Sequence, residues 1–172
     1  RLVNEAKDKD IALLVYGSPL VATTHVSLVL QAEDENVDYR IIHNASIFDA
    51  IANTGLQPYK FGKTASLPDW SKKGKSESFV DIIERNMKIK AHSLLLVDIG
   101  LELEDAVKQL KEATDNKIKR MIVCSKLGTK KEEVYFDRID NLQELEINKP
   151  YCFIIPSKLH FREKEALEEV SE

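Results

Sequence analysis

The chain has 172 residues, of which 43% are hydrophobic and 31% charged, and its net charge is -4. This composition is typical of a soluble globular protein with one mid-sized domain or two small ones. The sequence contains no long basic run and no apolar run of the roughly 18 residues that span a membrane. We therefore expect neither direct nucleic-acid binding nor membrane association. The opening residues RLVNEAKDKD do not form a signal peptide, and we expect a cytoplasmic protein.

The first predicted elements form a βαβ unit. Residues 11–17, IALLVYG, are a continuous apolar run of the kind found in strands buried on both faces of a parallel sheet. Residues 21–35 have helical spacing of their apolar side chains, and residues 37–45 are the next candidate strand. We expect Ser18 to cap the helix through its hydroxyl and Pro19 to occupy the first helical position.

The rest of the chain continues to alternate between helices and strands. Ser46 and Gly55 are good N- and C-terminal caps for a short helix between them. Further strands are predicted at residues 61–67, 93–101, 117–128, 132–138 and 151–156. Further helices are predicted at residues 79–90, 102–113 and 161–170, with a short helix or turn after residue 138. This alternation predicts an α/β fold with mostly parallel strand pairing and a domain boundary between residues 44 and 45.

A polar segment and two cysteines have ordinary structural explanations. Residues 68–78 are the most exposed loop, and its lysines could contact an acidic partner, although a solvated loop is the default. These lysines are Lys72, Lys73 and Lys75. Cys124 and Cys152 each lie in an apolar run without a second ligand at metal-binding spacing. We therefore expect buried free thiols in a reducing compartment, and no metal site.

The turn Gly17-Ser18-Pro19 is a candidate ligand site. Ligands of open α/β sheets bind beyond the carboxyl ends of the strands, and Gly17 permits a positive φ or a close approach of the ligand. Ser18 and Val21 would then face that ligand. Many such turns carry Gly and Ser for structural reasons alone, so both interpretations stay open. The sequence contains no GxGxxG, GxxxxGK[ST] or GxSxG motif, which leaves dinucleotide, P-loop and α/β-hydrolase sites unsupported.

Two ionisable residues, one in the first turn of a predicted helix and one at the end of a predicted strand, are further candidates. His25 follows two threonines, and a structural histidine is more common in such a place than a catalytic base. Asp98 ends the run LLLVD. Its carboxylate could hold a ligand hydroxyl or a metal, or cap the next segment.

Several stretches together resemble the diphthine synthases, the archaeal ones most closely. They are YGSPLVATTHVSLVLQA, IIHNASIFDAIANTGLQPYKFGKT, HSLLLVDI, SKLGT and IIPSKLHFREKEALEEV. The resemblance covers nearly the whole chain and is loosest between residues 100 and 119, where this sequence looks shorter than is usual in the family. It implies an α/β, two-domain class III, or tetrapyrrole methylase-like, methyltransferase that forms homodimers.

The resemblance also implies an activity and a cofactor. These enzymes bind S-adenosylmethionine, folded, in the cleft between their domains. They methylate the amino group of the modified histidine of elongation factor 2, a step of diphthamide biosynthesis, and the archaeal type yields a trimethylammonium group. An in-line methyl transfer to an amine mainly requires alignment, because the proton can leave to water. No catalytic residue is therefore assigned, and His25 is the best candidate for substrate contact.

The cofactor contacts of the family can be transferred to matching positions of this sequence. They fall on Ser18, Val21, Ser46, Ile47, Val97, Leu127 and Tyr151. Ser18 stands where the family has aspartate, so a carboxylate contact is lost, and Tyr151 stands where the family often has histidine. The family begins with a strand and a glycine-rich loop that form one wall of the cofactor cleft, and neither has a counterpart here. We therefore expect residues 1–44 to be the C-terminal part of an incomplete N-terminal domain and residues 45–172 to be the C-terminal domain.

Two alternatives stay open at this point. The first is another class III methylase, acting on a tetrapyrrole or on ribosomal RNA, because the fold alone would permit it. The second is a truncated, non-catalytic fragment that only dimerises or docks on a partner. The absent glycine-rich loop and Ser18 favour this second alternative, and titration with cofactor separates the two.

Overall fold

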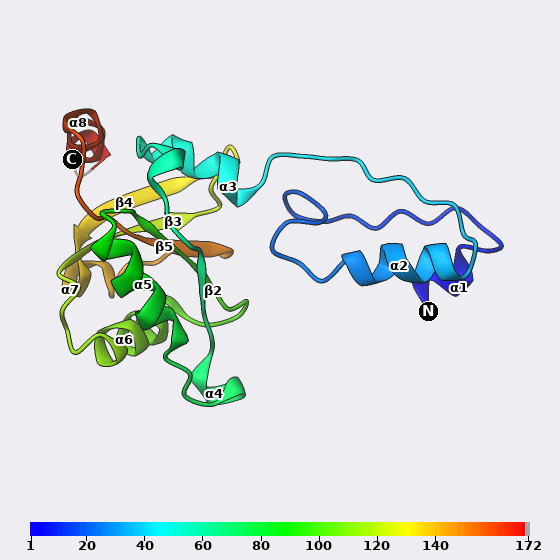
Figure 1. The fold of residues 1–172 in the computed structure, drawn as a ribbon, viewed down its shortest axis with the longest axis horizontal. Coiled ribbons are helices and arrows are strands. Elements are labelled where there is room, and N and C mark those ends of the chain that lie inside the picture. The colour runs from blue at the N-terminus through cyan, green and yellow to red at the C-terminus, as the bar shows by residue number, and fades with distance from the viewer. Residues whose placement is uncertain (171–172) are drawn as a thin grey trace. The chain divides into compact units, whose positions relative to one another are not determined.

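The protein consists of two compact units, Arg1–Ala50 and Ile51–Glu172. Their structure is a computed structural model that describes residues 1–170 (Figure 1). The first unit contains three short helices and no strand among its residues. These helices are α1 (Leu2–Glu5), α2 (Val26–Asp34) and α3 (Ile47–Ala50).

The strands predicted at residues 11–17 and 37–45 do not form. Both segments are irregular, and among the described residues no backbone hydrogen bond joins residues 11–17 or 38–44 to another segment. Both line the same cavity of about 890 Å³ instead of pairing, which leaves Leu14 92% and Ile42 74% exposed. The apolar pattern is that of a buried strand, but a strand exists only where a neighbouring strand completes its hydrogen bonds.

The helix predicted from residue 21 begins later than expected. α2 starts at Val26 after His25 as its N-cap, so the prediction that Ser18 caps it with Pro19 at the first helical position is wrong. Ala22 has a φ of 54°, which a continuous helix does not tolerate. The Pro19 carbonyl oxygen accepts a hydrogen bond from the Thr23 hydroxyl (3.0 Å), and this closes a turn in place of the first helical turn.

The second unit is built on a five-stranded mixed sheet. Its strands are β1 (Ala65–Leu67), β2 (Ser93–Val97), β3 (Arg120–Ser125), β4 (Glu133–Arg138) and β5 (Tyr151–Ile155), in the order β1-β2-β5-β3-β4. Among the named strands of the described residues, only the β1–β2 pair is parallel, so the prediction of mostly parallel pairing is wrong. β3 and β4 are joined by a short loop that permits only an antiparallel hairpin, and β5 inserts between β2 and β3 antiparallel to both.

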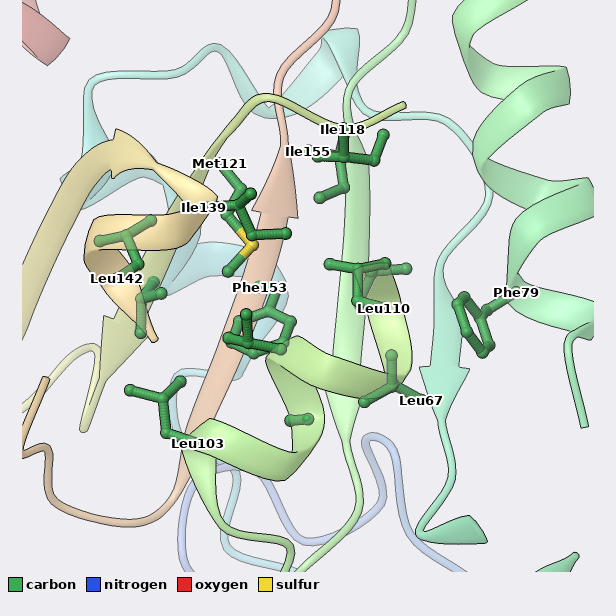
Figure 2. Close-up of a cluster of buried hydrophobic side chains, with 14 of the residues drawn as sticks. Leu67, Phe79, Leu103, Leu110, Ile118, Met121, Ile139, Leu142, Phe153 and Ile155 are labelled. Carbon is green, nitrogen blue, oxygen red and sulfur yellow. The ribbon is translucent and has the colours of Figure 1, made fainter. Parts of the chain in front are cut away.

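The helices of the second unit are η1 (Ile51–Thr54), η2 (Pro58–Lys60), α4 (Trp70–Lys73), α5 (Ser78–Lys88), α6 (Leu103–Ala113), α7 (Ile139–Leu142) and α8 (Phe161–Val170). Of these, α5, α6 and α7 contribute buried side chains to the main core. Phe79 of α5, Leu110 of α6 and Leu142 of α7 point toward Phe153 of β5 and its neighbours (Figure 2). Each of these four side chains is buried, and burial of this apolar area is the main force that holds the helices on the sheet.

The sequence predictions for the second unit are largely confirmed. Each predicted strand and helix is present, and the predicted helix between Ser46 and Gly55 becomes α3 followed by the 3₁₀ helix η1. Gly55 ends it with a φ of 79°. Cys124 and Cys152 are free and buried as predicted, directly opposite each other on β3 and β5.

The loop of residues 68–78 is less free than its composition suggests. It contains α4, which Asp69 caps by accepting a hydrogen bond from the Ser71 backbone N–H (3.0 Å). Its three lysines form ion pairs with carboxylates of the same unit: Lys72 with Asp69, Lys73 with Asp98, and Lys75 with Glu112. Their charges are therefore already balanced inside the unit.

Candidate cofactor site

The predicted cofactor contacts of the first unit lie on two touching turns. Gly17 has a φ of 78°, as its place in a tight turn requires. A Cβ atom on Gly17 would lie 3.7 Å from the Ala45 carbonyl oxygen, so the turn that carries Ser18 contacts the segment that leads into α3. Ser18 and Ser46 are both buried. The fold of this unit thus brings together two positions that are 28 residues apart in the sequence.

The hydroxyls of the two serines have different uses. The Ser46 hydroxyl donates to Asp49 Oδ2 (2.8 Å) and accepts from the Phe48 backbone N–H (3.2 Å), while the Ser46 N–H also donates to Asp49 (2.9 Å). These bonds lower the pKa of Asp49 and cap α3 in the way that Ser and an acidic residue three positions later often do. The Ser18 hydroxyl makes no hydrogen bond to residues 1–170. Ser18 can therefore offer its side chain to a ligand, whereas that of Ser46 is engaged.

The predicted contacts of the second unit meet at one edge of the sheet. β2 ends at Val97 and β5 begins at Tyr151, and because the two strands are antiparallel these residues lie at the same edge. β3 ends there too, since Ser125 pairs with Tyr151, and Leu127 follows two residues later. The structure thus brings Val97, Leu127 and Tyr151 together from three strand ends.

The side chain of Tyr151 is already used by the fold. Its hydroxyl donates to the Leu101 carbonyl oxygen (2.9 Å), its ring packs beside that of Phe153, and burial raises its pKa. The phenol is therefore neutral and held in the core. The hydroxyl and ring of Tyr151 are therefore not free to contact a ligand.

Asp98 is not free to bind a ligand. The Lys73 ammonium lies 2.9 Å from its carboxylate, and the Asp69 backbone N–H donates to the same group (3.3 Å). The hydrogen bond from Lys73 is the main reason that the pKa of Asp98 is lowered. The sequence left open whether Asp98 binds a ligand or a metal or has a structural role, and these contacts favour the structural role. Among the described residues, no group of three or more His, Cys, Asp or Glu side chains is arranged to hold a metal ion.

A residue that sequence reasoning missed fixes the loop of Leu127. Glu132 Oε2 accepts hydrogen bonds from the Gly128 backbone N–H (2.8 Å) and from the Asn53 side chain (2.8 Å). One carboxylate thus closes the loop between β3 and β4 and ties it to η1. Asn53 and Glu132 are 79 residues apart, so no local pattern could have indicated this contact.

His25 lies on the same turn as Ser18 and Val21. Its ring is half-buried and lines the cavity of the first unit. Its Nδ1 atom lies 2.8 Å from the Pro19 carbonyl oxygen, and its backbone N–H donates to Thr23 Oγ1 (3.3 Å). The two threonines and the histidine that follow the Gly-Ser-Pro turn therefore belong to one hydrogen-bonded loop.

Comparisons with known proteins identify the family. The family model "Tetrapyrrole (Corrin/Porphyrin) Methylases" matches residues 1–143. The diphthine synthase of Methanococcus maripaludis (strain C5) is 37% identical over 181 residues, which cover 97% of this chain and 71% of the relative. The diphthine synthase of Archaeoglobus fulgidus is 38% identical over 180 residues, which cover 100% of this chain and 70% of the relative. The chain belongs to the diphthine synthase family.

A solved structure agrees with this assignment. A crystal structure of diphthine synthase superposes with a TM-score of 0.84 at 37% sequence identity, and the match covers 99% of this chain and 69% of the other. The resemblance seen in the sequence is thus confirmed, as are the α/β fold of the class III methylases and the S-adenosylmethionine-dependent methyltransferase activity in diphthamide biosynthesis. The chain spans about seven-tenths of the length of the relatives it matches. None of the described helices is long and apolar enough to cross a membrane.

Proposed function

We propose that this chain binds S-adenosylmethionine and methylates the amino group of the modified histidine of elongation factor 2. Its membership of the diphthine synthase family carries this proposal. Relatives that are 37% and 38% identical align with 97% and 100% of the chain. We propose further that it acts in the cytoplasm as a homodimer. An alternative activity on a tetrapyrrole or on ribosomal RNA would share only the broader methylase fold.

The proposed contact residues, taken within each unit separately, have side chains that suit such a cofactor. Val21 and Ile47 in the first unit, and Val97 and Leu127 in the second, are half-buried apolar side chains at turns and strand ends. Side chains of this kind suit the adenine and methionine portions of the cofactor, while main-chain groups supply hydrogen bonds. Ser18 adds a hydroxyl that can donate or accept, although it cannot supply the negative charge of the aspartate that the family has there.

Alignment of the reacting groups is the main requirement that the chemistry places on the protein. When bound, S-adenosylmethionine supplies a methyl group that its positive sulfur has already activated. The chain's residues must hold the substrate amine in line with that methyl group at close range, which can supply a large share of the rate enhancement. The transfer needs no covalent enzyme intermediate, so the proposed reaction does not require a nucleophile–histidine–carboxylate triad.

The first test is a titration of the 172-residue chain with S-adenosylhomocysteine in a calorimeter. Binding in the micromolar range is the expected result. Ser18→Asp, which restores the charge of the family, should tighten binding by about tenfold if the carboxylate contacts the cofactor. Ser76→Asp, an exposed position in the loop of residues 68–78, is the matched control and should change nothing. Absence of binding by both the unchanged chain and Ser18→Asp would contradict the proposal.

The second test separates the substrates. The chain is incubated with methyl-labelled S-adenosylmethionine and elongation factor 2 that carries the modified histidine, and mass spectrometry counts the methyl groups added. Parallel incubations contain a tetrapyrrole precursor or ribosomal RNA. Labelling of the elongation factor alone is expected, and labelling of either other substrate in its place would overturn the choice of substrate.

A further inference from the structure

The hydrogen bonds of His25 fix which of its ring nitrogens carries the proton. The Pro19 carbonyl oxygen can only accept, and His25 Nδ1 lies 2.8 Å from it. In the neutral ring, Nδ1 must therefore hold the hydrogen, and Nε2 keeps a lone pair. Among residues 1–170, no hydrogen bond or ion pair involves Nε2.

The surrounding loop holds the ring in this state. Thr23 donates its hydroxyl to the same Pro19 oxygen (3.0 Å) and accepts from the His25 backbone N–H (3.3 Å). A second nitrogen tautomer would place a lone pair against the carbonyl oxygen, which is repulsive. The loop thus presents a half-buried imidazole whose only open polar atom is an acceptor.

The place of His25 in the first unit is also informative. It follows Ser18 and Val21 on one loop, and its ring lines the cavity of about 890 Å³. The titratable and charged residues that line the same cavity are Lys9, Asp10, Asp38, Tyr39, Arg40 and His43. None of the carboxylates among them is within ion-pair distance of the His25 ring in the described part of the chain.

We propose that His25 Nε2 is the atom that accepts the proton of the substrate amine. This inference rests on the proposed function. An alkyl amine is mostly protonated at neutral pH and has then no lone pair with which to attack. A proton passes from the ammonium to Nε2, the freed nitrogen bonds to the methyl carbon while the carbon–sulfur bond breaks, and the imidazolium releases its proton to water.

Repeated methylation makes such an acceptor more useful. Each of the first two transfers leaves a nitrogen that again carries a proton and a positive charge. That proton must leave before the next transfer can occur. A fixed acceptor serves all of these steps, and the quaternary product has no proton left to bind it.

The test compares His25→Asn with the unchanged chain. Asparagine keeps an N–H near the position of Nδ1, so the bond to the Pro19 oxygen can persist, but it has no basic Nε2. We expect the rate of methyl transfer to elongation factor 2 at pH 7 to fall by about a hundredfold, a typical effect of losing a positioned proton acceptor. The loss should shrink to less than about threefold near pH 10, where the amine is neutral without help.

Two controls keep the result specific. His160→Asn makes the same substitution at an exposed histidine outside that cavity and should leave the pH profile unchanged. Nitrogen NMR of the unchanged chain should show the His25 proton on Nδ1, independently of activity. S-adenosylhomocysteine binding by His25→Asn should equal that of the unchanged chain.

The possible outcomes separate this inference from the proposed function. An equal loss of rate for His25→Asn at every pH, an unchanged rate, or a proton found on Nε2 would each overturn the role of His25 alone. If the unchanged chain transfers no methyl group, the proposed function fails and the role of His25 fails with it. A loss confined to the pH range in which the amine is protonated supports the inference.

Discussion

Glu163 on α8 and His92 at the start of β2 form a fully buried pair, with His92 Nε2 3.3 Å from Glu163 Oε1. The same carboxylate forms an ion pair with Lys60 and accepts the backbone N–H groups of Gln57 (3.1 Å) and His160 (2.7 Å). Its two oxygens are thus fully satisfied. One side chain therefore ties α8 to η2 and to the sheet.

The charge states in this cluster follow from its hydrogen bonds. His92 Nδ1 accepts from the Ser157 backbone N–H (2.9 Å), so the ring proton lies on Nε2 and faces Glu163. Burial lowers the pKa of His92, although Glu163 opposes this effect. Burial acts to raise the pKa of Glu163, but the Lys60 ammonium and the backbone N–H groups outweigh it and hold that pKa at about 2. The folded protein thus contains neutral His92 and ionised Glu163.

The first prediction concerns acid unfolding. For both groups the pKa of the folded state lies below the ordinary value, so the unfolded chain binds the proton first as the pH falls. Stability is complete above pH 6.5, the ordinary value of His92, and declines below it. A second loss follows between pH 4.5 and about 2, where Glu163 is protonated. Urea unfolding at a series of pH values measures both, and a flat profile from pH 7 to pH 3 would contradict this assignment.

The second prediction is the cost of removing the Glu163 charge. Glu163→Gln leaves a partly buried Lys60 without its counter-ion and His92 without its acceptor charge. We expect the free energy of unfolding to fall by about 3 kcal/mol, the range observed when one partner of a buried pair is lost. Glu165→Gln, an exposed carboxylate on the same helix, should cost less than about 0.5 kcal/mol. Equal effects of the two substitutions would show that the buried cluster does not stabilise the fold.

The third prediction separates backbone strain from packing at two glycines. Gly55 and Gly74 have nearly equal φ values of 79° and 75°, so alanine is strained by about 1 kcal/mol at either position. A Cβ atom on Gly55 would lie only 2.3 Å from the Cβ of Ala166 on α8, whereas one on Gly74 meets nothing within 4 Å. Gly55→Ala should therefore destabilise the protein by about 1–3 kcal/mol more than Gly74→Ala. Similar melting temperatures for the two variants would mean that α8 does not pack closely on Gly55.

The fourth prediction concerns the apolar side chains of the first unit. Leu14 and Ile42 are 92% and 74% exposed and line one cavity, an arrangement that favours binding of hydrophobic dyes and self-association. Leu14→Lys should reduce the fluorescence of the bound dye and the fraction of protein that sediments as associated species. The free energy of unfolding should change little. Ile99→Lys, at a 93% exposed position of the second unit, is the matched control. The prediction is wrong if the two substitutions reduce dye binding equally.

The fifth prediction tests the loop that carries Leu127. Glu132→Ala removes the acceptor of the Gly128 N–H and of the Asn53 side chain, each worth about 1 kcal/mol. The proposed cofactor contact of Leu127 should then be less ordered, and S-adenosylhomocysteine should bind about fivefold to tenfold more weakly. Glu168→Ala, an exposed carboxylate on α8, should leave binding unchanged. Unchanged binding by Glu132→Ala would place Leu127 outside the cofactor contacts.

The sequence predicted the elements of the second unit because their signals are local. The apolar run that ends at Val97 and the amphipathic spacing of residues 102–113 specify a strand and a helix whatever surrounds them. The sequence also indicated the family, because stretches such as PLVATTH and HNASI agree with the diphthine synthases in order and spacing. The apolar run of residues 11–17 shows the limit of such signals. Its pattern predicts a strand, but none of the described segments pairs with it.

Tertiary structure alone decided which distant groups meet. The antiparallel place of β5 brings Tyr151 beside Val97 and turns the Tyr151 side chain into the core, and no periodicity in either segment indicates this. The bonds of Glu163 to His92 and Lys60 join residues 71 and 103 positions apart. Local patterns reflect backbone preference and burial within a few residues, whereas strand order and buried ion pairs depend on packing the whole unit. The sequence by itself determined the family and most of the helices and strands, and the packing decided which of their side chains remain free for a ligand.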